Sequence, residues 1–262
     1  MTAAVQTVGR AALGVIEEFG GVCLLLGRTF RAFPQLPRAF HLTVEQMYRV
    51  GVQSLPLVIV TSVFTGGVAA VQAAYQFQDY VPMRYLGTVI GKSVVIELGP
   101  VLTALVVAGR VSASIAAELG TMRVTEQVDA LETMAIDPVR FLVLPRFVAA
   151  AVMLPVVTCF SDALAIVGGW VVATLHLHVS TGTFLEGLQL FFYTGDVIGG
   201  LIKAWVFGMA IAAMGCYFGM KTRGGAEGVG IATTKAVVWA CLTILISDYV
   251  LASVLFSTVL GK

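Results

Sequence analysis

Residues 50–74 contain no charged side chain, and this single run limits the kind of fold that the chain can adopt. At 1.5 Å per residue a helix of this length crosses the roughly 30 Å hydrocarbon core of a bilayer. Of all residues, 58% are hydrophobic and only 12% are charged, about half the charged share of a soluble domain. The net charge of +1 provides no general attraction for nucleic acid. The chain is therefore predicted to be an all-α integral membrane protein.

Residues 5–33 have the pattern of an amphipathic helix that lies in the membrane interface. Apolar side chains recur at spacings of three and four, at Val8, Ala12, Val15, Phe19, Val22, Leu26 and Phe30. Polar side chains fall on the opposite face, at Gln6, Arg10, Glu17, Arg28 and Arg31. A helix packed on a soluble core is the alternative, but no soluble domain is visible in the sequence. We expect residues 1–49 to form a cytoplasmic segment with this helix and residues 50–262 to form the transmembrane domain.

The distribution of Lys and Arg predicts the topology. Basic residues gather before residue 50, around residues 110–146 and in 221–235, which is expected to be a Gly-rich loop. All three groups can face the cytoplasm only if residues 141–185 cross the membrane once. Five spans and a cytoplasmic N-terminus follow, with spans expected at 50–74, from 86 past 107, once within 141–185, at 197–220 and at 237–260. The rest of 141–185 is an external extension or a re-entrant piece, and the path of 163–196 stays open.

Small residues recur at the four-residue spacing that lets helices approach closely in lipid. Examples are Gly215 with Gly219, and Ser112 with Ala116. The pattern predicts tight helix packing, within the chain or in a dimer, and identifies no function.

Glu97 is the most informative single residue, because a carboxylate inside a span is costly and usually faces a cavity or a partner group. Lys92 is five positions away, which is not the spacing of a good pair within one α-helix. Pro100 removes a backbone donor and favours a kink. A purely structural carboxylate is the alternative. Lys203 and Asp248 are also charged and within spans, and packing or snorkelling explains them equally well.

The segment Thr125–Met134 has the pattern of a short amphipathic helix between the second and third spans. We expect Thr125 to cap it, with Glu126 in its first turn. Apolar Val128, Leu131, Met134 and Ala135 share one predicted face, and Glu126, Asp129 and Glu132 share the other. Such an element either rests on the bundle or couples to a soluble partner.

Catalytic and nucleotide-binding signatures are absent from the sequence. The stretch Gly87–Ser93 has three residues between its glycines where a phosphate-binding loop needs four. The four cysteines and three histidines form no pattern of metal ligands. The chain is therefore expected to be a transport subunit without a cofactor or metal of its own, and any ATP would be bound by another chain.

Several motifs closely resemble the MlaE/YrbE permease family, over nearly the whole chain after about residue 45. They are ELGP at 97–100, AGRVSASIAAELG at 108–120, MRVTEQVDALETMAIDP at 122–138, PRF at 145–147 and GIATTK at 230–235. The family forms the membrane part of ABC transporters that move phospholipid between the inner and outer membranes of Gram-negative bacteria. The resemblance implies an interfacial helix, five spans per subunit, a homodimer and a multi-pass location in the bacterial inner membrane.

The resemblance also implies partners and sites. A cytoplasmic ATPase would carry ATP and Mg²⁺, often with a small STAS-domain protein, and an MCE-domain protein would bind on the periplasmic side. Residues 126–137 would couple to the ATPase, and the expected coupling residues are Arg123, Thr125, Glu126, Val128, Asp129, Leu131, Glu132, Met134 and Asp137. The expected lipid cavity contains Glu97, Leu98, Lys92, Val63, Phe64, Val71 and Tyr75.

Two other classes of function stay open on the sequence. One is a proton- or ion-coupled secondary transporter that uses Glu97 and Asp248 as a relay, although no inverted repeat is visible. The other is a structural scaffold without transport. Direction of transport and head-group preference do not follow from the sequence.

Overall fold

In the computed structural model, which describes residues 2–77, 80–190 and 193–258, every regular element is a helix. Five helical stretches, three of them made of two or more consecutive elements, are long and apolar enough to cross a membrane. They are Phe40–Phe77, Met83–Val124, Val139–Leu175, Thr194–Met220 and Gly225–Leu255. The prediction of an all-α chain with five candidate spans is confirmed.

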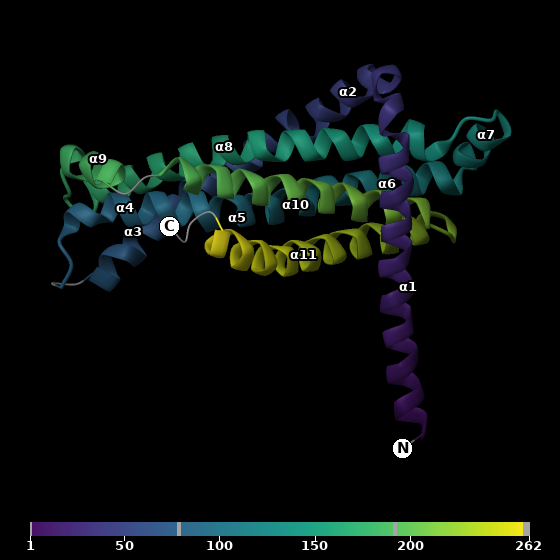
Figure 1. The fold of residues 1–262 in the computed structure, drawn as a ribbon, viewed down its shortest axis with the longest axis horizontal. Coiled ribbons are helices and arrows are strands. Elements are labelled where there is room, and N and C mark those ends of the chain that lie inside the picture. The colour runs from purple at the N-terminus through teal and green to yellow at the C-terminus, as the bar shows by residue number, and fades with distance from the viewer. Residues whose placement is uncertain (1, 78–79, 191–192, 259–262) are drawn as a thin grey trace.

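The N-terminal helix α1 (Thr2–Ala32) runs crosswise to the five long helices and extends beyond them (Figure 1). Val22 and Thr29 are buried against the bundle, whereas Phe19 and Phe30 are exposed. The side chains of Val8, Ala12 and Val15, which were expected on the apolar face, lie outside the described residues. A 3₁₀ helix, η1 (Phe33–Ala39), with prolines at its second and fifth positions, turns the chain into the bundle.

The first span is built from α2 (Phe40–Val50), a short 3₁₀ turn η2 (Val52–Ser54) and α3 (Leu55–Phe77). The turn η3 (Met83–Tyr85) opens the second span, which is one continuous rod of five segments. These are α4 (Leu86–Ser93), the π-helical η4 (Val94–Leu98), α5 (Gly99–Val107), the π-helical η5 (Ala108–Ser112) and α6 (Ala113–Val124). The short helix α7 (Gln127–Thr133) follows at one end of the bundle (Figure 1).

The third candidate span is one continuous rod, Val139–Leu175, as the charge pattern predicts. It consists of the π-helical η6 (Val139–Val143) and α8 (Leu144–Leu175). The remaining residues form α9 (Thr181–Leu190), which packs on α4 at the end of the bundle opposite α7 (Figure 1). A Cβ atom on Gly87 would lie 2.2 Å from the carbonyl oxygen of Phe184. The close contact of α4 with α9 therefore requires glycine there. Within the described part of 163–196, which the sequence left open, 163–175 continue α8, 181–190 form α9 and 194–196 begin α10.

The last two spans are α10 (Thr194–Met220) and α11 (Gly225–Thr258). The expectation of a Gly-rich loop over 221–235 is wrong, because the helix already begins at Gly225. Gly224 and Gly225 have φ angles of +91° and +71°, a backbone conformation that glycine adopts without strain. These two residues complete the turn, so the rest of the stretch continues as helix.

The small-residue motifs pack against one another within the chain. A Cβ on Gly215 would lie 3.0 Å from the carbonyl oxygen of Ser112, and a Cβ on Gly219 would lie 2.8 Å from the Cβ of Leu119. This seam joins α10 to α6 and therefore explains both motifs without a second subunit.

Candidate functional site

Lys203 is the centre of a cluster of charges inside the bundle. Its side chain is only 2% exposed, and its Nζ lies 2.5 Å from Glu97 Oε2 and 2.9 Å from Asp248 Oδ1. The three residues come from η4, α10 and α11, so the cluster joins three of the rods. A buried ammonium in a span requires such partners. Lys203 and Asp248 are thus packing partners of Glu97 and do not snorkel to the membrane surface.

The cluster has two carboxylates and one ammonium, and it is open on one side. Glu97 is 43% exposed, whereas Asp248 is 15% exposed at its side chain. With both carboxylates ionised the cluster has one unbalanced negative charge. The exposed oxygen edge of Glu97 is therefore the place where a positively charged or hydrogen-bond-donating group would be stabilised.

A cavity of about 540 Å³ lies beside this edge, between α3 and the α4–η4 part of the second rod. Its wall contains Glu97, Leu98 and Lys92, all three predicted from the sequence, together with Ala69, Gln72, Ala73, Gln76, Phe77, Val89, Ser93 and Ile96. The wall thus combines apolar surface with a carboxylate, an ammonium and two amides. This combination fits an amphiphilic molecule better than a purely apolar one.

Lys92 is held at this wall by contacts outside its own helix. Its Nζ lies 3.4 Å from Asp196 Oδ2 and 5.0 Å from the ring centre of Tyr193. Asp196 is buried, while Lys92 keeps a third of its side chain exposed. Lys92 and Glu97 therefore have separate partners on α10 and do not pair with each other, as their spacing predicts.

The other predicted cavity residues lie on a different face of α3. Val63, Phe64, Val71 and Tyr75 are exposed and are not part of the wall of this cavity. Their assignment to a lipid cavity stays a prediction. Gln72 and Gln76 do line the cavity and were not singled out from the sequence. Two amides four positions apart in an otherwise apolar span are the signal that could have found them.

The π-helical segment η4 sets the position of Glu97. Gly99 N–H bonds to Val94 O, five residues back, and Pro100 follows with no N–H to donate. The wider turn accommodates the missing donor without a break in the rod. The three π segments of the described chain each hold one charged residue, namely Glu97 in η4, Arg110 in η5 and Arg140 in η6.

Asp162 on α8 packs against Gly99, the residue that directly follows η4. A Cβ built on Gly99 would lie 1.6 Å from Asp162 Oδ1, so the carboxyl group occupies the space that a side chain would need. Next to Asp162 in sequence, Ser161 joins three helices. Thr103 donates to the Ser161 hydroxyl at 2.6 Å, Ser161 and Ser62 are 2.8 Å apart, and Ser62 donates to Val58 O at 2.6 Å. These bonds tie α5, α8 and α3 together beneath the cavity.

The predicted amphipathic helix is present, but its start was predicted wrongly. Thr125 does not cap it, because its hydroxyl donates to Thr121 O at 2.8 Å in the preceding helix. Glu126 takes a left-handed conformation with φ +61° and breaks the two helices apart. The helix α7 is therefore only Gln127–Thr133, and Glu126 precedes it.

The faces of α7 differ in part from the predicted ones. Val128 is fully buried, Leu131 is half-buried and Met134 is 69% exposed. Arg123 forms an ion pair with Asp129, which links α7 back to α6. Asp137 Oδ1 accepts a bond from Val139 N–H at 3.0 Å and thereby supports the start of η6. Glu132 and Met134 are left exposed at the end of the molecule.

Charged contacts join the first three spans to one another close to α7. Glu118 on α6 lies 3.1 Å from Arg49 Nη1 and 2.9 Å from Arg146 Nη2. Arg110 donates to Ser54 Oγ at 2.8 Å and to Gln53 Oε1 at 2.9 Å. These contacts therefore join the first, second and third spans to one another near the α7 segment.

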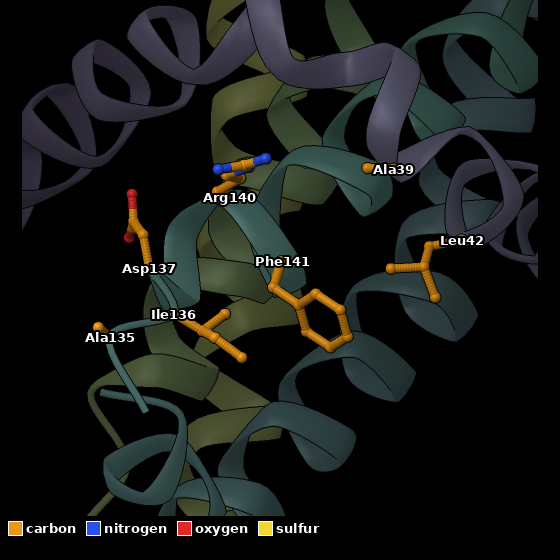
Figure 2. A pocket seen from close by; sticks show the side chains of 7 residues that line it. All are labelled: Ala39, Leu42, Ala135, Ile136, Asp137, Arg140 and Phe141. Atoms are coloured by element: carbon orange, nitrogen blue, oxygen red, sulfur yellow. The ribbon is translucent and has the colours of Figure 1, made fainter. Parts of the chain in front are cut away.

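Beside α7 lies a second cavity of about 410 Å³, shown in Figure 2. Ile136, Asp137, Arg140 and Phe141 come from the segment after α7, and Ala39 and Leu42 form the facing wall, with Ala135 at the edge. This hollow extends the exposed surface of the α7 segment toward the first span.

Comparison with known proteins gives these two sites a context. The profile of the family described as Permease MlaE matches residues 43–254. The chain belongs to the MlaE permease family.

Relatives match the MlaE-family chain over nearly its full length. A probable ABC transporter permease protein of Rickettsia bellii is 39% identical and covers 96% of this chain and 97% of its own. One from Synechocystis is 44% identical over 82% of this chain and 81% of its own. The intermembrane phospholipid transport system permease protein MlaE of Haemophilus influenzae is 33% identical over 96% and 97%. The chain is thus an ABC transporter permease of the MlaE family.

Proposed function

We propose that this chain is the membrane subunit of an ABC transporter that moves phospholipids between the inner and outer bacterial membranes. The observation that carries the proposal is the charge cluster of Glu97, Lys203 and Asp248 at the wall of an amphiphilic cavity, in a chain of this family. The Haemophilus relative is itself described as a phospholipid transport permease.

Phospholipid chemistry fits the cavity wall. Apolar Leu98 and Ile96 would contact the acyl chains, and Lys92 would attract the phosphate. The exposed edge of Glu97 would accept donors from the head group, such as an amine or hydroxyl. Because Lys203 is already fully used by two carboxylates, it positions Glu97 and does not itself reach the lipid.

A homodimer would complete the cavity. α11 is the least buried of the five candidate spans, and Leu245 and Tyr249 on it are exposed. The apolar stripe of α3 with Phe64, Val71 and Tyr75 is exposed as well. These faces contact either lipid or a second copy. Two copies joined near the first, second and last spans would place the predicted residues of α3 against a shared cavity.

Energy would come from a partner ATPase that binds ATP and Mg²⁺ in the cytoplasm. It would dock on α7 and on the neighbouring segment up to Asp137, and the contacts of Glu118 and Arg123 would pass the movement to the spans. ATP binding and hydrolysis would thereby change the width of the cavity. An MCE-domain protein would bind at the α9 end, and a STAS-domain protein would assist the ATPase.

The expected location is the bacterial inner membrane, with the N-terminus and α7 on the cytoplasmic side. Basic residues support this orientation, since Arg123 and Arg140 flank α7 along the chain and Lys221 lines a hollow together with Arg123.

Purification of the tagged full chain in mild detergent, followed by mass spectrometry of bound proteins and lipids, tests the proposal. We expect an ABC ATPase, an MCE-domain protein and phospholipid to copurify. The chain could instead be recovered without any ATPase, and its transport could stop when the proton gradient is collapsed. These two results together would support a secondary transporter that relies on Glu97 and Asp248.

A further inference from the structure

Three cations and one carboxylate meet where α1 crosses the ends of α10 and α11. Lys221 Nζ lies 3.0 Å from Glu18 Oε2 and 3.2 Å from Tyr217 Oη. Arg223 and Lys235 line the same small cavity of about 230 Å³. Within the described residues neither Arg223 nor Lys235 has a carboxylate within ion-pair distance. The site therefore has two positive charges that the protein does not balance.

A groove of about 440 Å³ adjoins this basic cavity and is almost wholly apolar. The two share Glu18 and Phe218 in their walls, so they lie directly next to each other. Side chains of three helices line the groove, among them Phe19 and Val22 of α1, Met214 of α10, and Trp239, Leu242 and Ile246 of α11. The combined site is charged at one end and apolar along the rest.

This groove is separate from the cavity at Glu97. Its α11 residues Trp239, Thr243, Ile246 and Val250 are spaced by three and four and lie on one face of the helix. At about 100° per residue, Asp248 lies on nearly the opposite face of α11. The transport cavity and this groove thus use different sides of the last span.

The depth of the site matches that of a lipid head group. Lys221 directly follows the end of α10, and Arg223 precedes the start of α11 at Gly225. The ends of spans lie at the level of the phosphates in a bilayer, and Lys and Arg at this level attract anionic head groups. The groove continues from there along the apolar length of both spans.

We propose that this site binds one phospholipid of the surrounding bilayer, separate from transport. Its phosphate lies among Lys221, Arg223 and Lys235, and one acyl chain lies in the groove between α10 and α11. The helix α1 closes the site from outside through Glu18, Phe19 and Val22. A lipid is favoured over a second copy because the unbalanced positive charge is confined to one end, next to a narrow groove whose only charged wall residue in the described chain is Glu18, the partner of Lys221.

The test uses the full chain in nanodiscs of phosphatidylethanolamine and phosphatidylglycerol. A trace of phosphatidylglycerol with a diazirine on its acyl chain is added, and adducts are mapped by peptide mass spectrometry after irradiation. We expect adducts on the groove segments around Met214–Phe218 and Trp239–Val250, above the yield on the exposed face of α3. No ATPase or transport is needed, so the outcome is independent of the proposed function.

Variants separate the two halves of the site. The double substitution Arg223→Gln with Lys235→Gln is expected to lower the groove adducts roughly tenfold or more. Ile246→Trp fills the groove and lowers them with all charges intact. The matched control is Arg28→Gln with Arg31→Gln, which removes two exposed cations of α1 away from the site and leaves the yield unchanged. A diazirine fatty alcohol without phosphate is expected to label wild type and the first variant equally.

Two results would overturn the proposal. One is a yield of adducts on the groove segments that is no higher than the yield on α3, or that does not fall when Arg223 and Lys235 are both replaced by Gln. The other is efficient disulfide formation between two copies carrying Ile246→Cys, because a second subunit would then cover the groove.

Discussion

Glu97 and Lys203 are 106 positions apart in the chain, yet Lys203 Nζ donates to Glu97 Oε2 at 2.5 Å. The bond joins the π-helical turn of the second span to the middle of α10, and Asp248 adds α11 on the other side of the ammonium. Because the cluster is also the charged wall of the cavity, the packing of three spans and the proposed contact with lipid depend on the same atoms.

Removal of the ammonium should therefore damage the fold. Lys203→Met leaves two carboxylates close together without their shared partner, and we expect a loss of about 3 kcal/mol in stability, the lower end of the range because Glu97 is partly exposed. Thermal unfolding in detergent measures it. The triple change Glu97→Gln, Lys203→Met and Asp248→Asn should regain most of the stability while lipid transfer stays low. Arg31→Met, which removes an exposed cation, serves as the control, and an equal loss there would contradict the argument.

Gly99 should tolerate no side chain while Asp162 is present. Gly99→Ala places a methyl group on Asp162 Oδ1 and should cost about 1–3 kcal/mol. The matched control is Gly109→Ala in the same rod, where a Cβ meets no atom within 4 Å. Adding Asp162→Ala should restore the stability of the Gly99 variant, as measured by thermal unfolding. If the double variant is no more stable than Gly99→Ala, the two residues are not in contact.

The exposed surface of the α7 segment should be needed for ATPase binding. Glu132→Lys with Met134→Asp alters two of its exposed side chains, and we expect the ATPase to be lost on copurification and lipid transfer to fall at least tenfold. The control is Leu185→Asp with Leu190→Asp, two exposed apolar residues on α9 at the opposite end. Association that survives the first pair would show that the ATPase docks elsewhere.

Attachment of α1 should depend on pH through Glu18 and Lys221. Burial opposes the ionised form of Glu18, but hydrogen bonds from Tyr217 and Lys221 outweigh it and lower its pKa. Burial likewise opposes the charged form of Lys221, while its bonds to Glu18 and Tyr217 raise its pKa. The attachment of α1 to the bundle is thus complete at pH values between the unshifted pKa of Glu18 and the unshifted pKa of Lys221. It weakens as pH falls through the lowered pKa of Glu18, and it also weakens as pH rises through the raised pKa of Lys221.

Hydrogen exchange in α1 measures this attachment. Faster exchange is expected at either extreme of pH and, for Glu18→Gln, at neutral pH as well. Glu17→Gln, a change at the neighbouring exposed carboxylate, should have no effect. An α1 that exchanges equally in both variants would show that the Glu18–Lys221 pair does not hold it.

The sequence by itself determined the five spans, because each depends only on a local run of apolar residues long enough for a bilayer. It also singled out Glu97 and Lys92, since charges in a span are rare enough to be noticed, whereas Leu98 was expected only from the family resemblance. Local turn chemistry was less decisive. Thr125 was expected to cap α7, but its hydroxyl bonds to the preceding helix α6 instead. The helix start at Gly225 was missed because Gly224 and Gly225 alone complete the turn.

Only the tertiary structure decided which charges meet. Lys203 could have reached for the membrane surface, and its pairing with Glu97 and Asp248 depends on the rotation of three helices about their axes. The place of Asp162 against Gly99 likewise arises from packing between residues far apart in the chain. A pattern of apolar and polar residues records which face of a helix is buried, but not which side chain on another helix lies opposite.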